Sequence, residues 1–144
     1  MRNLIALLAI IIIGNMLSCT VETSDNGKLD GFWHLVSIDS VASGKTMDTE
    51  NDYYFWAFQY KLLSVRNTRT GSEYFLRFSH EGDSLLLSEP YMFISQGVDS
   101  LLPSADSLRE YGINSLEERF KVVSLSSQRM ELRSRMLQLK FKKF

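Results

Sequence analysis

The sequence of 144 residues is short of cysteine, proline and histidine, which occur once, twice and twice. A single cysteine excludes an internal disulfide. One cysteine and two histidines together are too few for an ordinary structural zinc site. Neither sign of charge is in excess, because 16 basic residues face 17 acidic ones. The concentrated basic surface of a nucleic-acid-binding protein is therefore not expected.

Long apolar runs are also missing, except at the start of the chain. Residues 4–13 contain no polar side chain and follow the single positive charge of Arg2. This length fits the apolar part of a signal peptide, about 7–15 residues. It is too short for a membrane-spanning helix of about 18 or more.

The apolar run leads to Met16-Leu17-Ser18-Cys19, which resembles a bacterial lipobox. The resemblance implies that residues 1–18 are a signal peptide and that Cys19 is acylated, for instance with palmitate. Two or three such chains hold a protein on a membrane effectively permanently, here the outer membrane of a bacterial envelope. The alternative is a buried free cysteine.

A polar segment, 19–28, follows the cysteine and is predicted to be a tether ahead of one domain at 29–144. Surface-exported lipoproteins resemble one another in a compact acidic stretch directly after the cysteine. Residues 20–23 match that stretch only in part, so the periplasmic face of the membrane is favoured over the cell surface.

The domain carries a β pattern. Apolar and polar residues alternate most strictly at 53–67, 129–133 and 136–142, which indicates half-buried strands. Because 53–67 is longer than a usual strand, a break near Gln59–Lys61 is expected. Further strand candidates are 31–38, 74–78, 84–88 and 119–125.

Between the strands, 42–52 is predicted to be a loop, 91–103 irregular chain, and 107–110 a helical turn stopped by Gly112. About eight short antiparallel strands with one such turn favour an all-β, up-and-down barrel, since closure removes free strand edges. The alternative is an open sandwich.

Gly31-x-Trp33 on the first strand resembles the opening motif of lipocalins, in which the tryptophan seals the barrel floor. In that family a basic side chain of the last strand crosses the tryptophan, and Lys143 is placed to do so. The chain is also similar to the small lipocalin-like lipoproteins of the Bacteroides group. That similarity is carried by residues 56–63, 77–85, 108–113, 130–134 and 141–144.

The resemblance implies a lipocalin-like barrel that carries a ligand or serves as an envelope accessory. Aromatic side chains alternate along the middle run, and such a wall suits a small hydrophobic molecule with a polar end. The candidate ligand-binding residues are Tyr54, Trp56, Phe58, Tyr60, Tyr74 and Phe78. The alternatives are that these residues are plain core, and that a filled barrel contacts a protein partner.

No set of residues indicates catalysis, a cofactor or a metal, so a non-enzymatic protein is expected. His34 and His80 are far apart in sequence and are predicted to lie on sheet faces. The acids at 48, 50 and 52 alternate as in a calcium loop but lack its turn glycine and closing glutamate. They are predicted to form a solvated loop.

Overall fold

The computed structural model describes residues 24–94 and 97–144, so the predicted signal peptide and Cys19 lie outside the described residues. The described residues contain two short 3-10 helices and ten strands. They are η1 (Gly27–Leu29), β1 (Gly31–Ser40), β2 (Thr46–Asp48), β3 (Tyr54–Gln59), β4 (Leu62–Asn67), β5 (Glu73–Glu81), β6 (Ser84–Ile94), β7 (Val98–Leu101), η2 (Asp106–Tyr111), β8 (Glu118–Leu125), β9 (Arg129–Arg133) and β10 (Leu137–Lys143). None of these described helices has the length and apolar character needed to cross a membrane.

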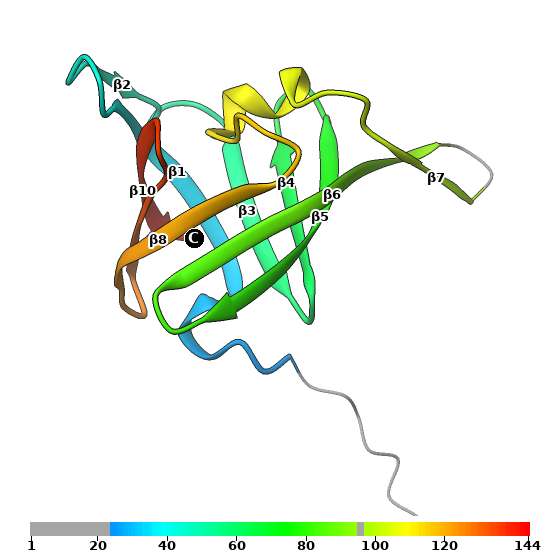
Figure 1. Ribbon diagram of the computed structural model, residues 1–144, viewed down its shortest axis with the longest axis horizontal. Coiled ribbons are helices and arrows are strands. Elements are labelled where there is room, and N and C mark those ends of the chain that lie inside the picture. Colours follow the sequence, from blue (N-terminus) through cyan, green and yellow to red (C-terminus); the bar gives the residue numbers. More distant parts are fainter. Residues whose placement is uncertain (1–23, 95–96) are drawn as a thin grey trace, which may run out of the picture.

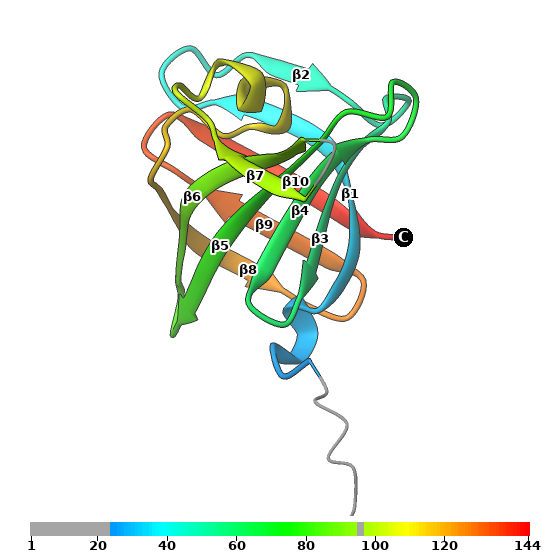
Figure 2. The ribbon, with the colours of Figure 1, turned by 90° about the vertical axis from the view of Figure 1, so that its right-hand side faces the viewer.

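Eight of the strands close into a ring (Figures 1 and 2). Antiparallel pairing runs in the order β1, β3, β4, β5, β6, β8, β9, β10, and β10 returns to β1. The closing pair is long, extending from Trp33 opposite Lys143 to Ser40 opposite Leu137. The predicted all-β, up-and-down barrel is therefore confirmed, and the open sandwich is excluded.

The long aromatic run divides where its length suggested. β3 ends at Gln59 and β4 begins at Leu62, so that Gln59 and Leu62 face each other across a two-residue turn. The helical turn before Gly112 is also present as η2. Gly112 has a φ of 83°, and a Cβ at this position would lie 2.6 Å from Cδ2 of Leu139. Glycine is needed there for both the backbone angle and the close packing.

Two predictions for the connecting segments were wrong. The loop 42–52 contains the short strand β2, which pairs with β1. The segment 91–103 is not irregular, because β6 continues to Ile94 and pairs with β7. These two strands leave the ring as a two-stranded arm, here defined as residues 91–94 and 98–101 (Figure 1). The described side chains of the arm are exposed or only partly buried, and its sequence accordingly shows no alternation.

The inside of the ring is packed with apolar side chains. Trp33, Trp56, Tyr111, Phe58, Phe120 and Phe141 are the largest of those that are fully buried. η1 lies at one end of the barrel, below it in Figure 1, and η2 lies across the other end, at the top. η1 contributes Leu29 to the core, and η2 contributes Leu108 and Tyr111.

Candidate functional site

The η1 end of the barrel is organised around Trp33. Its indole Nε1 donates a hydrogen bond to the carbonyl of Leu29, 2.9 Å away. Nζ of Lys143 lies 4.2 Å from the centre of the Trp33 ring, where the resemblance placed a basic side chain. The same amine donates to the carbonyl of Asp30. An ammonium over an indole face is attracted by the ring quadrupole, so this contact ties the last strand to the first.

Gly31 makes room for that amine. Its φ is 122°, and a Cβ would lie 2.8 Å from Nζ of Lys143. Burial lowers the pKa of Lys143, and the charge of Asp30 opposes this effect. Burial alone would raise the pKa of Asp30, but hydrogen bonds from Ser24 and Asn26 and the charge of Lys143 hold it below its ordinary value.

Three of the predicted ligand-binding residues belong to the core of the barrel. Trp56 is 0 % exposed, and its ring centre lies 5.8 Å from that of Phe120 and 5.0 Å from that of Phe141. Its indole nitrogen donates to the carbonyl of Tyr111 on η2. Phe58 is 2 % exposed and packs on Trp56. Tyr54 is partly buried at the η2 end of the same face.

The expectation that Tyr60 continues this aromatic face was wrong. Tyr60 lies in the β3–β4 turn with a φ of 55° and is 47 % exposed. The turn interrupts the alternation, so the side chain leaves the face that Trp56 and Phe58 share. Ser24 and Asn26 hold Tyr60: its amide donates to Oγ of Ser24 at 2.8 Å, and Nδ2 of Asn26 donates to its carbonyl at 2.7 Å. Part of the predicted tether therefore lies against the barrel.

Beside this turn the structure has a pocket of about 390 Å³ that opens to solvent between the residues before η1 and strand β5. We call it the mouth pocket. It brings together two of the predicted residues, Tyr60 and Phe78. The ring of Phe78 meets that of Phe58 edge to face, with centres 5.0 Å apart, so Phe78 separates the mouth pocket from the core. The other lining residues are Asp25, Asn26, Lys61, Ser79 and His80.

The remaining predicted residue, Tyr74, lies at the opposite end. Tyr54 and Tyr74 both meet the ring of Tyr111 edge to face, with centres 5.6 and 6.2 Å apart. Burial raises the pKa of Tyr111, and the charge of Glu110 adds to this effect. Burial is also the main cause of the raised pKa of Tyr54. Tyr111 of η2 thus packs against Tyr54 and Tyr74 and closes this end of the barrel.

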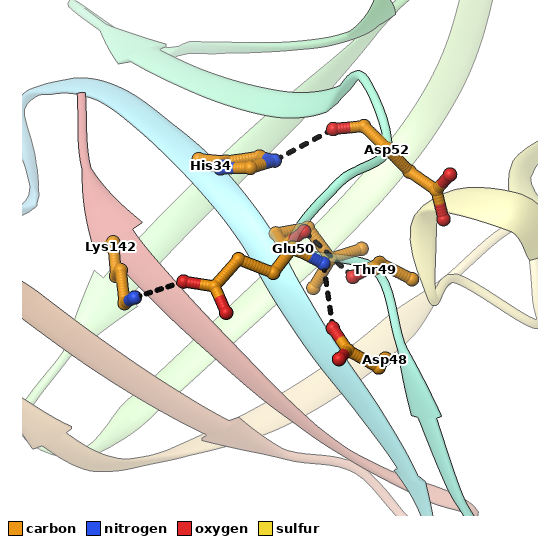
Figure 3. Close-up of polar contacts among 7 residues, drawn as sticks. His34, Asp48, Thr49, Glu50, Asp52 and Lys142 are labelled. Atoms are coloured by element: carbon orange, nitrogen blue, oxygen red, sulfur yellow. Dashed lines mark hydrogen bonds and ion pairs between the residues drawn. The ribbon is translucent and has the colours of Figure 1, made fainter.

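The acidic loop, residues 48–52, is fixed against the outside of the barrel (Figure 3). Glu50 pairs with Lys142 of β10, and the ring of His34 bonds to the carbonyl of Asp52 at 2.8 Å. The carboxylate of Asp48 accepts from the amide of Glu50 within the loop, at 2.9 Å. Within residues 24–94 and 97–144, no three histidine, cysteine or acidic side chains gather as metal ligands would.

Comparison with known proteins agrees with this geometry. The profile of a family described as a lipocalin-like domain matches residues 12–144. The chain belongs to this lipocalin-like family. No curated protein matches it.

Two solved structures share the lipocalin-like fold. One is a lipocalin-like protein from Bacteroides uniformis ATCC 8492, with 24 % identity and a TM-score of 0.62, covering 82 % of this chain and 100 % of that chain. The other is an uncharacterized protein from Bacteroides eggerthii DSM 20697, with 19 % identity and a TM-score of 0.58, covering 81 % and 99 %. Both neighbours are matched over almost their whole length by part of this chain. Each solved chain thus forms the lipocalin-like fold at about four fifths of the length of this chain.

Sequence reasoning missed His80 as a residue of the mouth pocket and placed it on a sheet face with no further role. The available signal was its spacing, since Tyr74, Phe78 and His80 share one parity on a strand of the lipocalin-like barrel. The exposed apolar residues of the arm were missed as well. Phe93 is 59 % exposed and Leu101 68 % exposed.

Proposed function

We propose that this lipocalin-like protein is a non-enzymatic, lipid-anchored component of the bacterial envelope that binds a small hydrophobic ligand in the mouth pocket. The observation that carries the proposal is the pocket itself, about 390 Å³ in volume with the rings of Tyr60 and Phe78 in its wall. Small-molecule sites typically have volumes of about 300–1,000 Å³. Here the two rings lie beside five polar or charged residues, Asp25, Asn26, Lys61, Ser79 and His80.

The mouth pocket is favoured over the centre of the barrel because the centre is occupied by side chains. Trp56 is fully buried among the rings of Phe58, Phe120 and Phe141. A ligand at that level would have to displace this packing, and an emptied aromatic site costs about 3–5 kcal/mol. Binding at the mouth pocket needs no such rearrangement.

The test is a titration of residues 20–144 with N-phenyl-1-naphthylamine, a neutral dye that fluoresces in apolar surroundings. We expect saturable binding with a micromolar dissociation constant, about −8 kcal/mol. Phe78→Ala should weaken binding at least tenfold with the fold retained. Trp56→Ala is the matched control and should lower the free energy of unfolding more than it changes the binding.

Circular dichroism and urea unfolding on all three proteins separate loss of binding from loss of structure. Failure of the well-folded wild type to bind the dye would contradict the proposal. Equal binding by wild type and Phe78→Ala would place the ligand elsewhere.

A second candidate is an accessory protein whose filled barrel presents the arm to a protein partner. The observation that favours it is the exposure of Met92, Phe93, Ile94 and Leu101 on two strands outside the ring. Exposed apolar patches of this kind mark interaction sites. A photo-crosslinking amino acid at position 93 of the full chain should then yield one discrete product of higher mass in the envelope. The same group at exposed position 69, in the β4–β5 turn, should not.

A further inference from the structure

We propose that the ligand of the mouth pocket carries an uncharged hydroxyl group that hydrogen-bonds to Nε2 of His80. This inference rests on the proposed function and adds the chemical class of the ligand. It makes His80 the residue that distinguishes an amphipathic molecule from a purely apolar one.

The first observation is an unused polar atom. Among the described residues, Nε2 of His80 is buried without a hydrogen-bond partner, and His80 lines the mouth pocket. Buried polar atoms in folded proteins almost always have a partner, and one left unpaired is costly. Because Nε2 is buried as the ring stands, the His80 ring must turn toward the mouth pocket before a ligand group can reach this atom. That contact would remove the cost, whereas an apolar ligand would retain it.

The second observation is the position of His80 on β5. Phe78 and His80 are two residues apart, so both side chains lie on the face of β5 that carries the buried Leu76. Phe78 packs on Phe58 at the edge of the core, and His80 is one step nearer the end of the strand. A ligand with its apolar part on Phe78 therefore has its polar end at His80.

The third observation is the charge around the pocket. One acid, Asp25, and one base, Lys61, are its only lining residues with a fixed formal charge. Their charges cancel, so the pocket offers no excess of either sign to an ionic ligand. A hydroxyl both donates and accepts, and it pairs with an imidazole nitrogen in either tautomer.

The fourth observation is that the wall is held in place before any ligand arrives. A positive φ is costly for a bulky residue such as Tyr60 and persists only where the surroundings enforce it. Here the hydrogen bonds from Asn26 and to Ser24 fix the turn. A pocket whose walls are already ordered loses little entropy on binding, so one added hydrogen bond should be visible in the affinity.

The experiment compares three fluorescent probes with the same apolar body on residues 20–144: naphthalene, 2-naphthol and 2-naphthoate. We expect 2-naphthol to bind about tenfold more tightly than naphthalene and more tightly than 2-naphthoate. His80→Phe keeps a ring at this position and should reduce the preference for 2-naphthol to within twofold. His34→Phe, at the other histidine of the chain, is the control and should keep the preference.

A second measurement does not depend on any variant. With only two histidines in the chain, their side-chain ¹⁵N signals can be resolved by nuclear magnetic resonance. Addition of 2-naphthol should shift Nε2 of His80 and leave His34 unchanged, and naphthalene should shift neither nitrogen.

Three results would overturn the inference and leave the proposed function standing. They are equal affinity for naphthalene and 2-naphthol, tighter binding of 2-naphthoate, and a hydroxyl preference that survives in His80→Phe. Failure of all three probes and of N-phenyl-1-naphthylamine to bind the folded wild type would overturn the proposed function, and the inference with it.

Discussion

Trp33 connects the first strand, the last strand and η1 at a single side chain. It is fully buried, donates to the carbonyl of Leu29 and lies under the amine of Lys143. Trp33→Ala should lower the free energy of unfolding by about 3–5 kcal/mol, because it empties a large aromatic site. Urea unfolding measures this change. A loss under about 1 kcal/mol would show that Trp33 does not seal the η1 end.

Gly31 of β1 leaves room for the side chain of Lys143 on β10. Its φ of 122° suits glycine, and an added Cβ would push the amine of Lys143 away from Trp33. Gly31→Ala should cost about 1–3 kcal/mol of stability. Part of this loss should be absent when the change is made in a Lys143→Ala background. Strictly additive losses would mean that backbone strain alone is responsible.

Asp30, directly after η1, should make the stability of the protein depend on pH. Its pKa is lowered in the folded state because hydrogen bonds from Ser24 and Asn26 outweigh the effect of burial. A carboxyl of this kind contributes stability above its unfolded pKa of about 3.9, and the contribution is lost as pH falls through the folded value. Asp30→Asn should therefore be less stable than the wild type near pH 7.

The difference between Asp30→Asn and the wild type should shrink as the pH falls below the unfolded pKa of about 3.9, and it should vanish once the folded carboxyl is also protonated. Urea unfolding at several pH values measures it, with Asp83→Asn in the β5–β6 turn as the control. A difference that stays constant down to about pH 2 would contradict the shift at Asp30.

At the scale of elements, the arm differs from the ring in how it is held. Ring strands have neighbours on both sides, whereas β7 pairs only with β6 among the described strands. Two-stranded ribbons are marginally stable in water. The arm is supported by contacts of the aromatic side chain of Phe75 with those of Tyr91 and Phe93. An element of this kind is expected to open independently of the rest of the protein.

Amide hydrogen exchange should therefore be much faster for residues 99–101 than for β9 and β10. Phe75→Ala should increase exchange in the arm by at least tenfold and leave β9 and β10 unchanged. Equal protection of the arm and the ring would mean that the arm unfolds only with the whole domain.

At the scale of the whole molecule, the prediction concerns Cys19. Cys19→Ala should abolish fatty-acid labelling and membrane retention and leave the domain folded, because the described core is built from residues between Leu29 and Phe141. Metabolic labelling with a clickable fatty acid, followed by membrane fractionation, measures this. A labelled Cys19→Ala protein would refute the lipid anchor.

The closed ring of strands could be predicted from the amino-acid sequence. Strict alternation located β3, β4, β9 and β10. Met130, Leu132, Leu139 and Phe141, which share one parity within their strands, lie buried. The turn after Gln59 and the glycine after η2 were also readable. These features are local. Neighbouring residues determine which face of a strand is buried and where a tight turn forms.

The position of the pocket could not be predicted from the sequence, because it depends on packing between distant segments. Whether an aromatic wall leaves a cavity depends on the side chains opposite it, and rings from β8 and β10 together with η2 fill the barrel around Trp56. The mouth pocket is lined by residues 25–26, 60–61 and 78–80. These three segments are distant in sequence and meet only in the folded barrel. Parity directs a side chain to one face of a strand, but packing between distant segments decides which part of that face a ligand can reach.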